Sequence, residues 1–340
     1  MTEDNLATEL RDLVRAIVAD LPTSPSSTTS TLDAALWSTL ARSGLTRLTG
    51  PERRGGSGAG WLEAATVLGE LARNAVPHPL LEHDLLAGWL RDTVGLAATP
   101  TDAVATGMLI EPHATSNEVA WLPSAETVVV LDTSGGRALA FELPVAELAS
   151  TPGHTLAGTP AGRVVAISPP AGAIEVDPIL AEEWRHRGAL ARAIEMAASM
   201  EAVAEMCCQH ASTRVQFGRP LARFQAVQHL VTAVAGEAAL GRAIVDRAVA
   251  AVATDGFADP QTRFLVAAAK ACTGGSAATV VRSAHQLHGA LGTTLEHPLQ
   301  HYTRSLLSHR REYGATRAWE RRIEADASRV GGNLWKLVSA

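Results

Sequence analysis

The chain has 340 residues, of which 46% are hydrophobic and 19% charged, and its formal net charge at pH 7 is −6. This length is enough to bury a sizeable core in one large domain or in several smaller ones. The acidic balance argues against a nucleic-acid partner, because proteins that bind phosphate backbones carry a basic excess. The three cysteines include the adjacent pair Cys207 and Cys208, so they predict neither a disulfide framework nor a spaced zinc site, which fits a reducing cytosol.

The amino-terminal sequence MTEDNLATELRDL is acidic and amphipathic. It lacks the basic flank and apolar core of a signal peptide. No apolar run in the sequence reaches the length needed to cross a bilayer. We therefore expect a cytoplasmic protein with no membrane partner.

The first zone, residues 1–97, carries helical patterns. Apolar residues recur at helical spacing from Leu6 to Ile17, and the loop PTSPSSTTST then breaks the pattern. Helical patterns resume over residues 32–43 and over residues 61–74, the second after the glycine-rich sequence GGSGAG. The zone therefore predicts an amino-terminal helical domain.

The second zone, residues 98–177, has strand patterns. In VVVLDTSGGRALAFEL, two β-rich runs flank residues 133–136, which predicts a hairpin with a short glycine-containing loop. RVVAIS, residues 163–168, predicts another strand, which Pro169 and Pro170 would end. We expect a small, shortened central β domain.

The third zone, residues 178–340, is again helical, and its helices are long. One uninterrupted pattern covers residues 187–214, and two more begin near prolines and cover residues 260–288 and 298–328. The segment between the first two has an apolar stripe formed by Val227, Val231, Val234 and Ala238. Four long helices with short links predict an antiparallel four-helix bundle.

Three motifs lie in these zones: GPERRGGSGAGWLEAATVLGELAR at residues 50–73, RVQFGRPLARFQAVQH at residues 214–229 and QLHGALGTTLEHPLQHYTRS at residues 286–305. Their order, with a β domain between two helical zones, resembles the acyl-CoA dehydrogenase family. The matching family segments are Pro-Glu-x-x-Gly-Gly-x-Gly, Arg-x-x-Phe-Gly-x-x-Leu-x-x-x-Gln and Gln-Ile-His-Gly-Gly-x-Gly-x-x-x-Glu-x-Pro. The resemblance implies an α+β fold that is mainly α, with an amino-terminal helical domain, a small central β domain and a carboxy-terminal four-helix bundle that oligomerises.

The resemblance also implies a cofactor. Members of this family bind FAD at a subunit interface, where a Phe-Gly turn of the neighbouring subunit holds the adenosine-diphosphate end. Carried over to this chain, Arg214 would pair with the pyrophosphate as a charged fork, and Gln216 would hydrogen-bond to it. Phe217 and Leu221 would line an apolar slot. The alternative is a plain bundle loop that binds nothing, with Phe217 and Phe224 as core aromatics.

The third motif would meet the same half of the flavin. Gln286 and Leu287 lead into His288 and Gly289, and a glycine at this point lets the backbone approach a phosphate. This chain departs from the family at the next position, where Ala290 replaces a second glycine.

The catalytic base is not identified by the resemblance. Family members remove the α-proton of an acyl-CoA thioester with a glutamate, while a hydride leaves the β-carbon for the flavin. Tyr313 occupies the usual glutamate position, and a phenol with a pKa of about 10 is a poor base for this step. Glu312 comes one residue early, about 100° around a helix, and a surface pairing with Arg310 or Arg311 explains it as well. In members with the base in the first bundle helix, the register falls on Gly188.

A second departure concerns the β domain. The family's Thr-Glu-Pro-x-Ala-Gly-Ser-Asp loop and Trp-Ile-Thr-Asn turn contact the flavin ring and the thioester. Here LIEP is followed by HATSNEVAW, so only Glu111 and Pro112 remain. The chain therefore has the family residues that contact the adenosine end of FAD, but it lacks most of those that contact the flavin ring.

The family includes actinobacterial heterotetramers with short partner subunits in sterol and lipid catabolism, and the Ala and Arg content fits a GC-rich genome. Our hypothesis is a FAD-dependent acyl-CoA dehydrogenase in which this chain supplies the adenosine-diphosphate half-site. Its partners would be an acyl-CoA substrate, a homologous subunit that carries the glutamate, and an electron-transfer acceptor.

Two alternatives remain open. One is a self-sufficient homo-oligomeric flavoenzyme, either a dehydrogenase or a monooxygenase, in which Glu312 moves into place or no carboxylate base is needed. The other is a flavin-free scaffold or a protein of non-redox acyl-thioester chemistry, which Ala290 favours. No metal site is expected, because His285 and His288 share a helix face without an evident third ligand.

Overall fold

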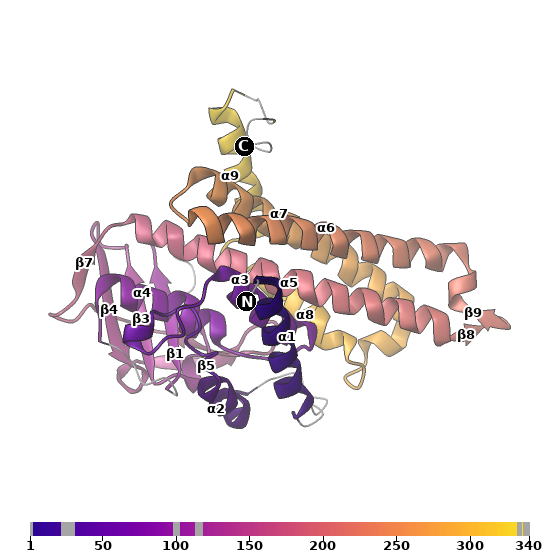
Figure 1. The fold of residues 1–340 in the computed structure, drawn as a ribbon, viewed down its shortest axis with the longest axis horizontal. Helices are drawn as coiled ribbons and strands as arrows, with labels where there is room; N and C mark the ends of the chain where they lie inside the picture. Colours follow the sequence, from indigo (N-terminus) through magenta and orange to yellow (C-terminus); the bar gives the residue numbers. More distant parts are fainter. Residues whose placement is uncertain (1–2, 22–30, 98–102, 113–117, 332–334, 336–340) are drawn as a thin grey trace. The chain divides into compact units, whose positions relative to one another are not determined.

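The computed structural model describes residues 3–21, 31–97, 103–112, 118–331 and 335. The chain forms two compact units (Figure 1). Unit 1 comprises Met1–Pro22, Thr29–Val67 and Pro77–Gly188, and unit 2 comprises Thr23–Thr28, Leu68–Val76 and Ala189–Ala340. The helices α3 and α5 each contribute residues to both units.

The predicted helices of the first zone are confirmed as α1 (Glu3–Ala19), α2 (Ala34–Arg42) and α3 (Trp61–Arg73). Asp33 caps α2, because its side chain accepts hydrogen bonds from the backbone N–H groups of Ala35 and Leu36 at 2.9 and 3.0 Å. This cap sets the start of α2 two residues after Leu32, where the apolar pattern begins. Most of the predicted loop PTSPSSTTST lies outside the described residues.

The glycine-rich motif before α3 is explained by close backbone packing. Gly55 and Gly58 have φ angles of 79° and 68°, which favour glycine. A Cβ atom at Gly56 would lie 2.0 Å from the carbonyl oxygen of Gly50, a separation that no side chain can occupy. The motif therefore folds the segment between α2 and α3 back on itself.

A π-helix that the sequence patterns do not predict, η2 (Leu81–Gly88), continues into α4 (Trp89–Val94). All eight of its residues are buried, including Glu82, His83 and Asp84. These titratable residues interrupt the apolar periodicity on which the prediction relies. His83 Nδ1 accepts a hydrogen bond from the N–H of Ala105 at 3.0 Å, and burial lowers the pKa of His83 to about 3.

The predicted hairpin is confirmed in unit 1. Strands β3 (Thr127–Asp132) and β4 (Ala138–Pro144) pair antiparallel. They belong to a four-stranded sheet of order β1-β3-β4-β7, with β1 (Ala105–Ile110) parallel to β3 and with β7 (Ile174–Val176) at the other edge. A second sheet has the order β2-β6-β5, formed by β2 (Glu118–Ala120), β6 (Pro160–Val164) and β5 (Ser150–His154).

The predicted strand over residues 163–168 is wrong in its position. Strand β6 covers Pro160–Val164, so it starts earlier and ends five residues before Pro169. Val165 already has an exposed side chain. The apolar run continued past the strand because Val165 is apolar without being part of the core.

Unit 2 is built on the long helices α5 (Ile179–Thr213), α6 (Gln225–Asp255) and α7 (Pro260–His288). Helix α7 has the predicted bounds, set by Asp259, which accepts a hydrogen bond from the N–H of Thr262 at 2.7 Å. On α6, the predicted apolar stripe is confirmed, because Val234 and Ala238 lie in the core. Figure 1 shows α6 and α7 side by side.

The predicted fourth long helix is wrong, because two shorter helices replace it: α8 (Leu299–His309) and α9 (Thr316–Arg329). Between them, Tyr313 and Gly314 have φ angles of 53° and 105°. A Cβ atom at Gly314 would lie 2.6 Å from Trp319 Nε1. Glu312 and Tyr313 therefore lie in a turn, and the rotation of about 100° per helical residue does not relate their directions.

One helical stretch, Pro260–Thr293, has the length and apolar composition of a membrane span. These properties are also those of a core helix, and 61% of its most apolar window is buried inside the protein. The stretch is therefore weak evidence for a membrane segment.

Candidate functional site

The RVQFG motif forms a tight hairpin after α5. Strands β8 (Val215–Gln216) and β9 (Arg219–Pro220) pair antiparallel, with Phe217 and Gly218 between them. The φ angles of Phe217 and Gly218 are 52° and 78°, as a two-residue type I′ turn requires. In Figure 1 the hairpin projects beyond the ends of α5 and α6.

Phe217 is not a core aromatic, because its side chain is 88% exposed. Its ring meets only the edge of Phe224, at a centroid distance of 6.0 Å, among the ring contacts of the described residues. The side chains of Arg214 and Gln216 are also exposed, and Leu221 is half-buried. These four residues thus offer an aromatic ring, a guanidinium and an amide to a ligand or a partner.

The segment is held in shape by its backbone. The N–H of Arg214 donates to the carbonyl of His210, and the N–H of Leu221 donates to the carbonyl of Arg214, both at 2.9 Å. The second bond closes the loop on which the turn sits. The hairpin therefore fixes the backbone position of Phe217.

The QLHG motif ends α7. Gln286, Gly289 and Ala290 are exposed. Gly289 has a φ of 59°, and a Cβ atom added there would meet no neighbouring atom of the described residues within 4 Å. Leu287 is buried in the core cluster of unit 2. Only the backbone of Leu287 is therefore left to meet a ligand.

Three histidine side chains are in contact between the end of α5, which precedes the RVQFG motif, and the QLHG segment at the end of α7. The ring of His210 near the end of α5 lies 4.4 Å from that of His288, and the ring of His288 lies 5.0 Å from that of His297. The sequence does not predict this cluster: His288 and His297 share the third motif, but His210 is far from them in the chain and belongs to no motif. Within the described part of the chain, no group of three or more His, Cys, Asp or Glu residues is arranged to hold a metal ion.

Glu312, the candidate base, is half-buried and lies in a cluster of charged side chains in unit 2. Its carboxylate accepts hydrogen bonds from Arg192 Nε at 2.7 Å and from Ser308 Oγ at 2.6 Å. Arg192 also pairs with Glu195 at 2.8 Å. Lys270 donates a hydrogen bond to the carbonyl of His309, the last residue of α8.

The cluster determines the charge state of Glu312. Burial alone would raise the pKa of this carboxyl, but Arg192, followed by His309, Ser308 and Lys270, lowers the pKa to about 2. Burial lowers the pKa of Lys270 to about 7. A carboxylate with so low a pKa is a weak base, because it has little tendency to take a proton near neutral pH.

The two other base positions offer no carboxylate. Tyr313 lies in the turn after α8, where its carbonyl accepts a hydrogen bond from Trp319 Nε1 at 3.1 Å. Gly188 is buried within α5. Glu111, which remains from the family's β-domain loop, forms an ion pair with Arg185. The loop residues after Pro112, at 113–117, lie outside the described residues.

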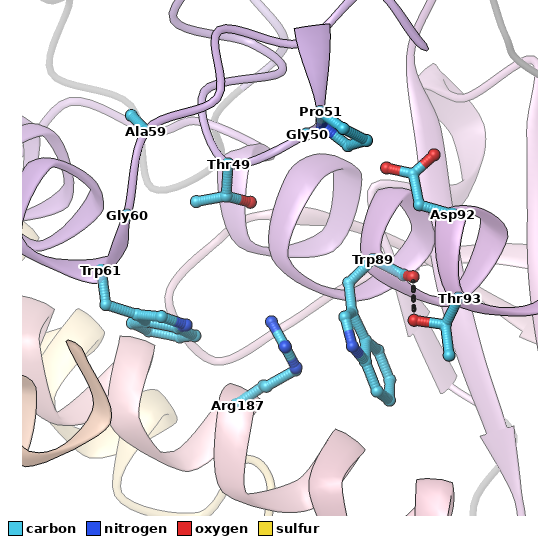
Figure 2. Close-up of a pocket in the computed structure, with 10 residues that line it drawn as sticks. All are labelled: Thr49, Gly50, Pro51, Ala59, Gly60, Trp61, Trp89, Asp92, Thr93 and Arg187. Carbon is cyan, nitrogen blue, oxygen red and sulfur yellow. Dashed lines mark hydrogen bonds between the residues drawn. The ribbon is translucent and has the colours of Figure 1, made fainter. Parts of the chain in front are cut away.

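A separate pocket of about 350 Å³ lies in unit 1 (Figure 2). The first family motif supplies one wall, and Arg187 lies between the indole rings of Trp61 and Trp89, 5.9 and 4.4 Å from their centroids. Arg187 forms an ion pair with Glu183 at 2.8 Å, and burial lowers the pKa of Arg187 to about 10. The lining combines two indole rings with the charged side chains of Arg187 and Asp92, and Gly188 follows Arg187 in the chain.

The fold and these motifs define a class of protein: a mainly helical protein with small β sheets between an amino-terminal helical region and a carboxy-terminal helical region. Family models agree. The acyl-CoA dehydrogenase N-terminal domain matches residues 2–92, and the acyl-CoA dehydrogenase C-terminal domain matches residues 181–326. The chain belongs to the acyl-CoA dehydrogenase family of oxidoreductases.

Two relatives are named acyl-CoA dehydrogenase IpdE2. The protein from Mycobacterium tuberculosis is 28% identical over 304 residues, which cover 86% of this chain and 87% of that protein. The protein from Mycolicibacterium smegmatis is 27% identical over 331 residues, covering 94% and 99%. The chain thus resembles these mycobacterial proteins over most of their length.

Solved structures show the same fold. A chain of the ChsE4-ChsE5 complex from Mycobacterium tuberculosis has a TM-score of 0.83 at 22% identity, covering 96% of this chain and 98% of that one. A chain of a Tcur3481-Tcur3483 steroid ACAD variant has a TM-score of 0.84 at 22% identity, covering 98% and 100%. The predicted fold class is confirmed.

Proposed function

We propose that this chain is one subunit of a heteromeric, FAD-dependent acyl-CoA dehydrogenase, to which it supplies the adenosine-diphosphate half-site but not the catalytic base. One observation carries the proposal. The chain presents Arg214 and the ring of Phe217 on an exposed hairpin, while Glu312 is bound to Arg192 and Ser308. A chain that builds one half of a flavin site and lacks the other needs a partner that builds the rest.

The residues at the hairpin and at the end of α7 fit a dinucleotide. A guanidinium suits the pyrophosphate, an exposed aromatic ring suits the adenine, and the open space at Gly289 lets the backbone approach. The holding residues would be Arg214, Gln216, Phe217, Leu221, Gln286 and the backbone of Leu287 and Gly289. When bound, FAD accepts the hydride that leaves the β-carbon of the acyl group.

The names of two structural neighbours support a heteromer. The ChsE4-ChsE5 and Tcur3481-Tcur3483 structures each contain two different proteins, and the second is described as a steroid ACAD. Their identity to this chain is low, so the support is by analogy of fold. An acyl-CoA with a steroid-derived or other lipid acyl group is the corresponding substrate class.

The test is to purify the chain alone and together with a homologous subunit that carries the glutamate, and to measure visible absorbance and subunit masses. We expect a yellow protein only from the co-expressed pair, with about one FAD per unlike pair. Arg214→Ala should lower the flavin content of the pair. The matched control is Arg137→Ala, which removes an exposed arginine directly before β4 in unit 1 and should leave the flavin content unchanged.

The other outcomes decide between the alternatives. Stoichiometric flavin in the chain alone would refute the shared site and favour the self-sufficient flavoenzyme. Flavin in neither sample would refute the cofactor and favour the scaffold or the non-redox protein.

A further inference from the structure

The rings of His210, His288 and His297 contact one another in series, with interplanar angles of 36° and 65°, and this row of rings is called the stack below. The stack lies beside the proposed half-site and has no role in it so far. His210 precedes Arg214 by one helical turn, and the carbonyl of His210 accepts the N–H of Arg214. His288 lies between Gln286 and Gly289 in the chain. The stack therefore adjoins both segments that would hold the diphosphate.

The hydrogen bonds of the stack determine which nitrogens carry protons. His288 Nδ1 lies 2.9 Å from the carbonyl of Ala284, so this nitrogen carries the proton and donates it. His297 Nδ1 accepts the N–H of Leu299 at 3.2 Å, so its proton lies on Nε2. His297 thus has an N–H directed away from Leu299, and His210 and His297 are both half-buried.

The groups that shift the pKa values of His210 and His297 are histidines and an arginine. His210 is affected by His288, His297 and Arg214. His297 is affected by His288 and His285, and His285 is affected by His288. Among the described residues, no carboxylate contributes to the pKa shifts of His210, His285 or His297. Burial first, and then these neighbours, lower the pKa values of His210, His285 and His297.

We propose that the His210–His288–His297 stack is an anion-recognition element that takes up a proton when the diphosphate of a dinucleotide binds beside Arg214. The proposal rests on the proposed half-site and adds its regulation by pH. The stack is short of negative charge, and a diphosphate would supply it. The carboxy-terminal ends of α5 and α7, where His210 and His288 lie, favour a protonated imidazole through their partial negative charge.

The direction of the pH dependence follows from the charges. In the free chain His210 and His297 are mainly neutral near pH 7, because burial and their neighbours lower the pKa values of these two side chains. A bound diphosphate raises the pKa of a neighbouring histidine, since opposite charges favour the protonated form. Binding therefore takes up a proton, and the affinity rises as the pH falls from the pKa of the complex toward that of the free chain.

The experiment is calorimetric binding of ADP-ribose to the full chain between about pH 8.5 and about pH 5.5, the range in which histidines titrate. ADP-ribose carries a doubly esterified diphosphate whose charge does not change over this range. Two buffers with different ionisation enthalpies give the number of protons taken up. We expect binding about three- to tenfold tighter at the lower pH, since one unit of pKa shift corresponds to tenfold in affinity.

His210→Gln and His297→Asn should each reduce the proton uptake and flatten the pH dependence, and the Asn side chain can keep the bond to the N–H of Leu299. The control, His154→Gln, changes an exposed histidine of β5 in unit 1 and should leave both quantities unchanged. Binding of ADP-ribose that needs Arg214 but has no pH dependence and no proton uptake would overturn the inference and leave the half-site standing. Absence of ADP-ribose binding at every pH would overturn the inference, and the flavin content of the co-purified pair would then decide whether the half-site stands.

Discussion

Phe217 combines two features that each oppose stability. Its φ of 52° places a residue with a Cβ in the left-handed region, which costs about 1–2 kcal/mol for residues other than glycine. Its ring is 88% exposed, so little burial offsets that cost. Asn-Gly is the sequence that type I′ turns favour. An aromatic ring in this position is therefore explained by contact with another molecule, not by the folding of the hairpin.

Phe217→Asn tests this at the residue scale. We expect the free energy of unfolding to stay the same or to rise by up to about 1 kcal/mol, because Asn adopts the left-handed region more readily. The flavin content of the co-purified pair should fall, because the ring would no longer meet the adenine. Urea denaturation and visible absorbance measure the two quantities. A loss of stability with unchanged flavin would show that the ring serves the hairpin.

At the scale of elements, α7 and the segment after it show what the sequence can and cannot specify. The start and end of α7 were predictable, because Asp259 and Pro260 form a standard helix start and Gly289 a standard stop. The break between α8 and α9 carried a signal of the same kind in Gly314. It was overlooked because the helical pattern resumes on both sides of it. The π-helix η2 had no such signal, since it buries three consecutive titratable residues.

Some residues of the candidate site are predictable from the sequence, and others are not. Arg214 and Gly289 are candidates because they stand in motifs that resemble segments of the family. The partners of Glu312 are not predictable, since Arg192 and Lys270 reach it from other helices. The contacts of His210 with His288 likewise depend on how the ends of α5 and α7 meet. Packing between elements distant in the chain decides these features.

Gly314→Ala tests the turn between α8 and α9. The φ of 105° is strained for any residue with a side chain, and the added Cβ would meet Trp319 Nε1 at 2.6 Å. We expect the free energy of unfolding to fall by about 1–3 kcal/mol, the usual range for backbone strain at one residue. Gly135→Ala is the control, because its Cβ would meet no atom within 4 Å. Equal denaturation midpoints for the two variants would contradict the role of Gly314.

At the scale of the whole molecule, the proposal divides catalysis between two chains. The family's α-proton abstraction needs a carboxylate that accepts a proton, and Glu312, with a pKa of about 2, is held instead by Arg192 and Ser308. This chain then contributes binding, and the unlike subunit contributes the base. Loss of a catalytic base lowers kcat, whereas loss of a structural ion pair lowers the free energy of unfolding.

The variant Glu312→Gln distinguishes a catalytic role of Glu312 from a structural one. In the heteromer we expect kcat to change by less than about twofold, whereas removal of a true general base costs about 10²–10⁴-fold. The variant should lose about 1.5–3 kcal/mol of unfolding free energy, the range for a hydrogen bond to a charged group. Because its pKa is lowered from 4.5 to about 2, the carboxylate stabilises the fold above pH 4.5 and loses this effect as the pH falls toward 2. Wild type and variant should therefore converge in stability over that range. A kcat that collapses while stability is unchanged would instead assign the base to this chain, and the partner subunit would not be needed to supply it.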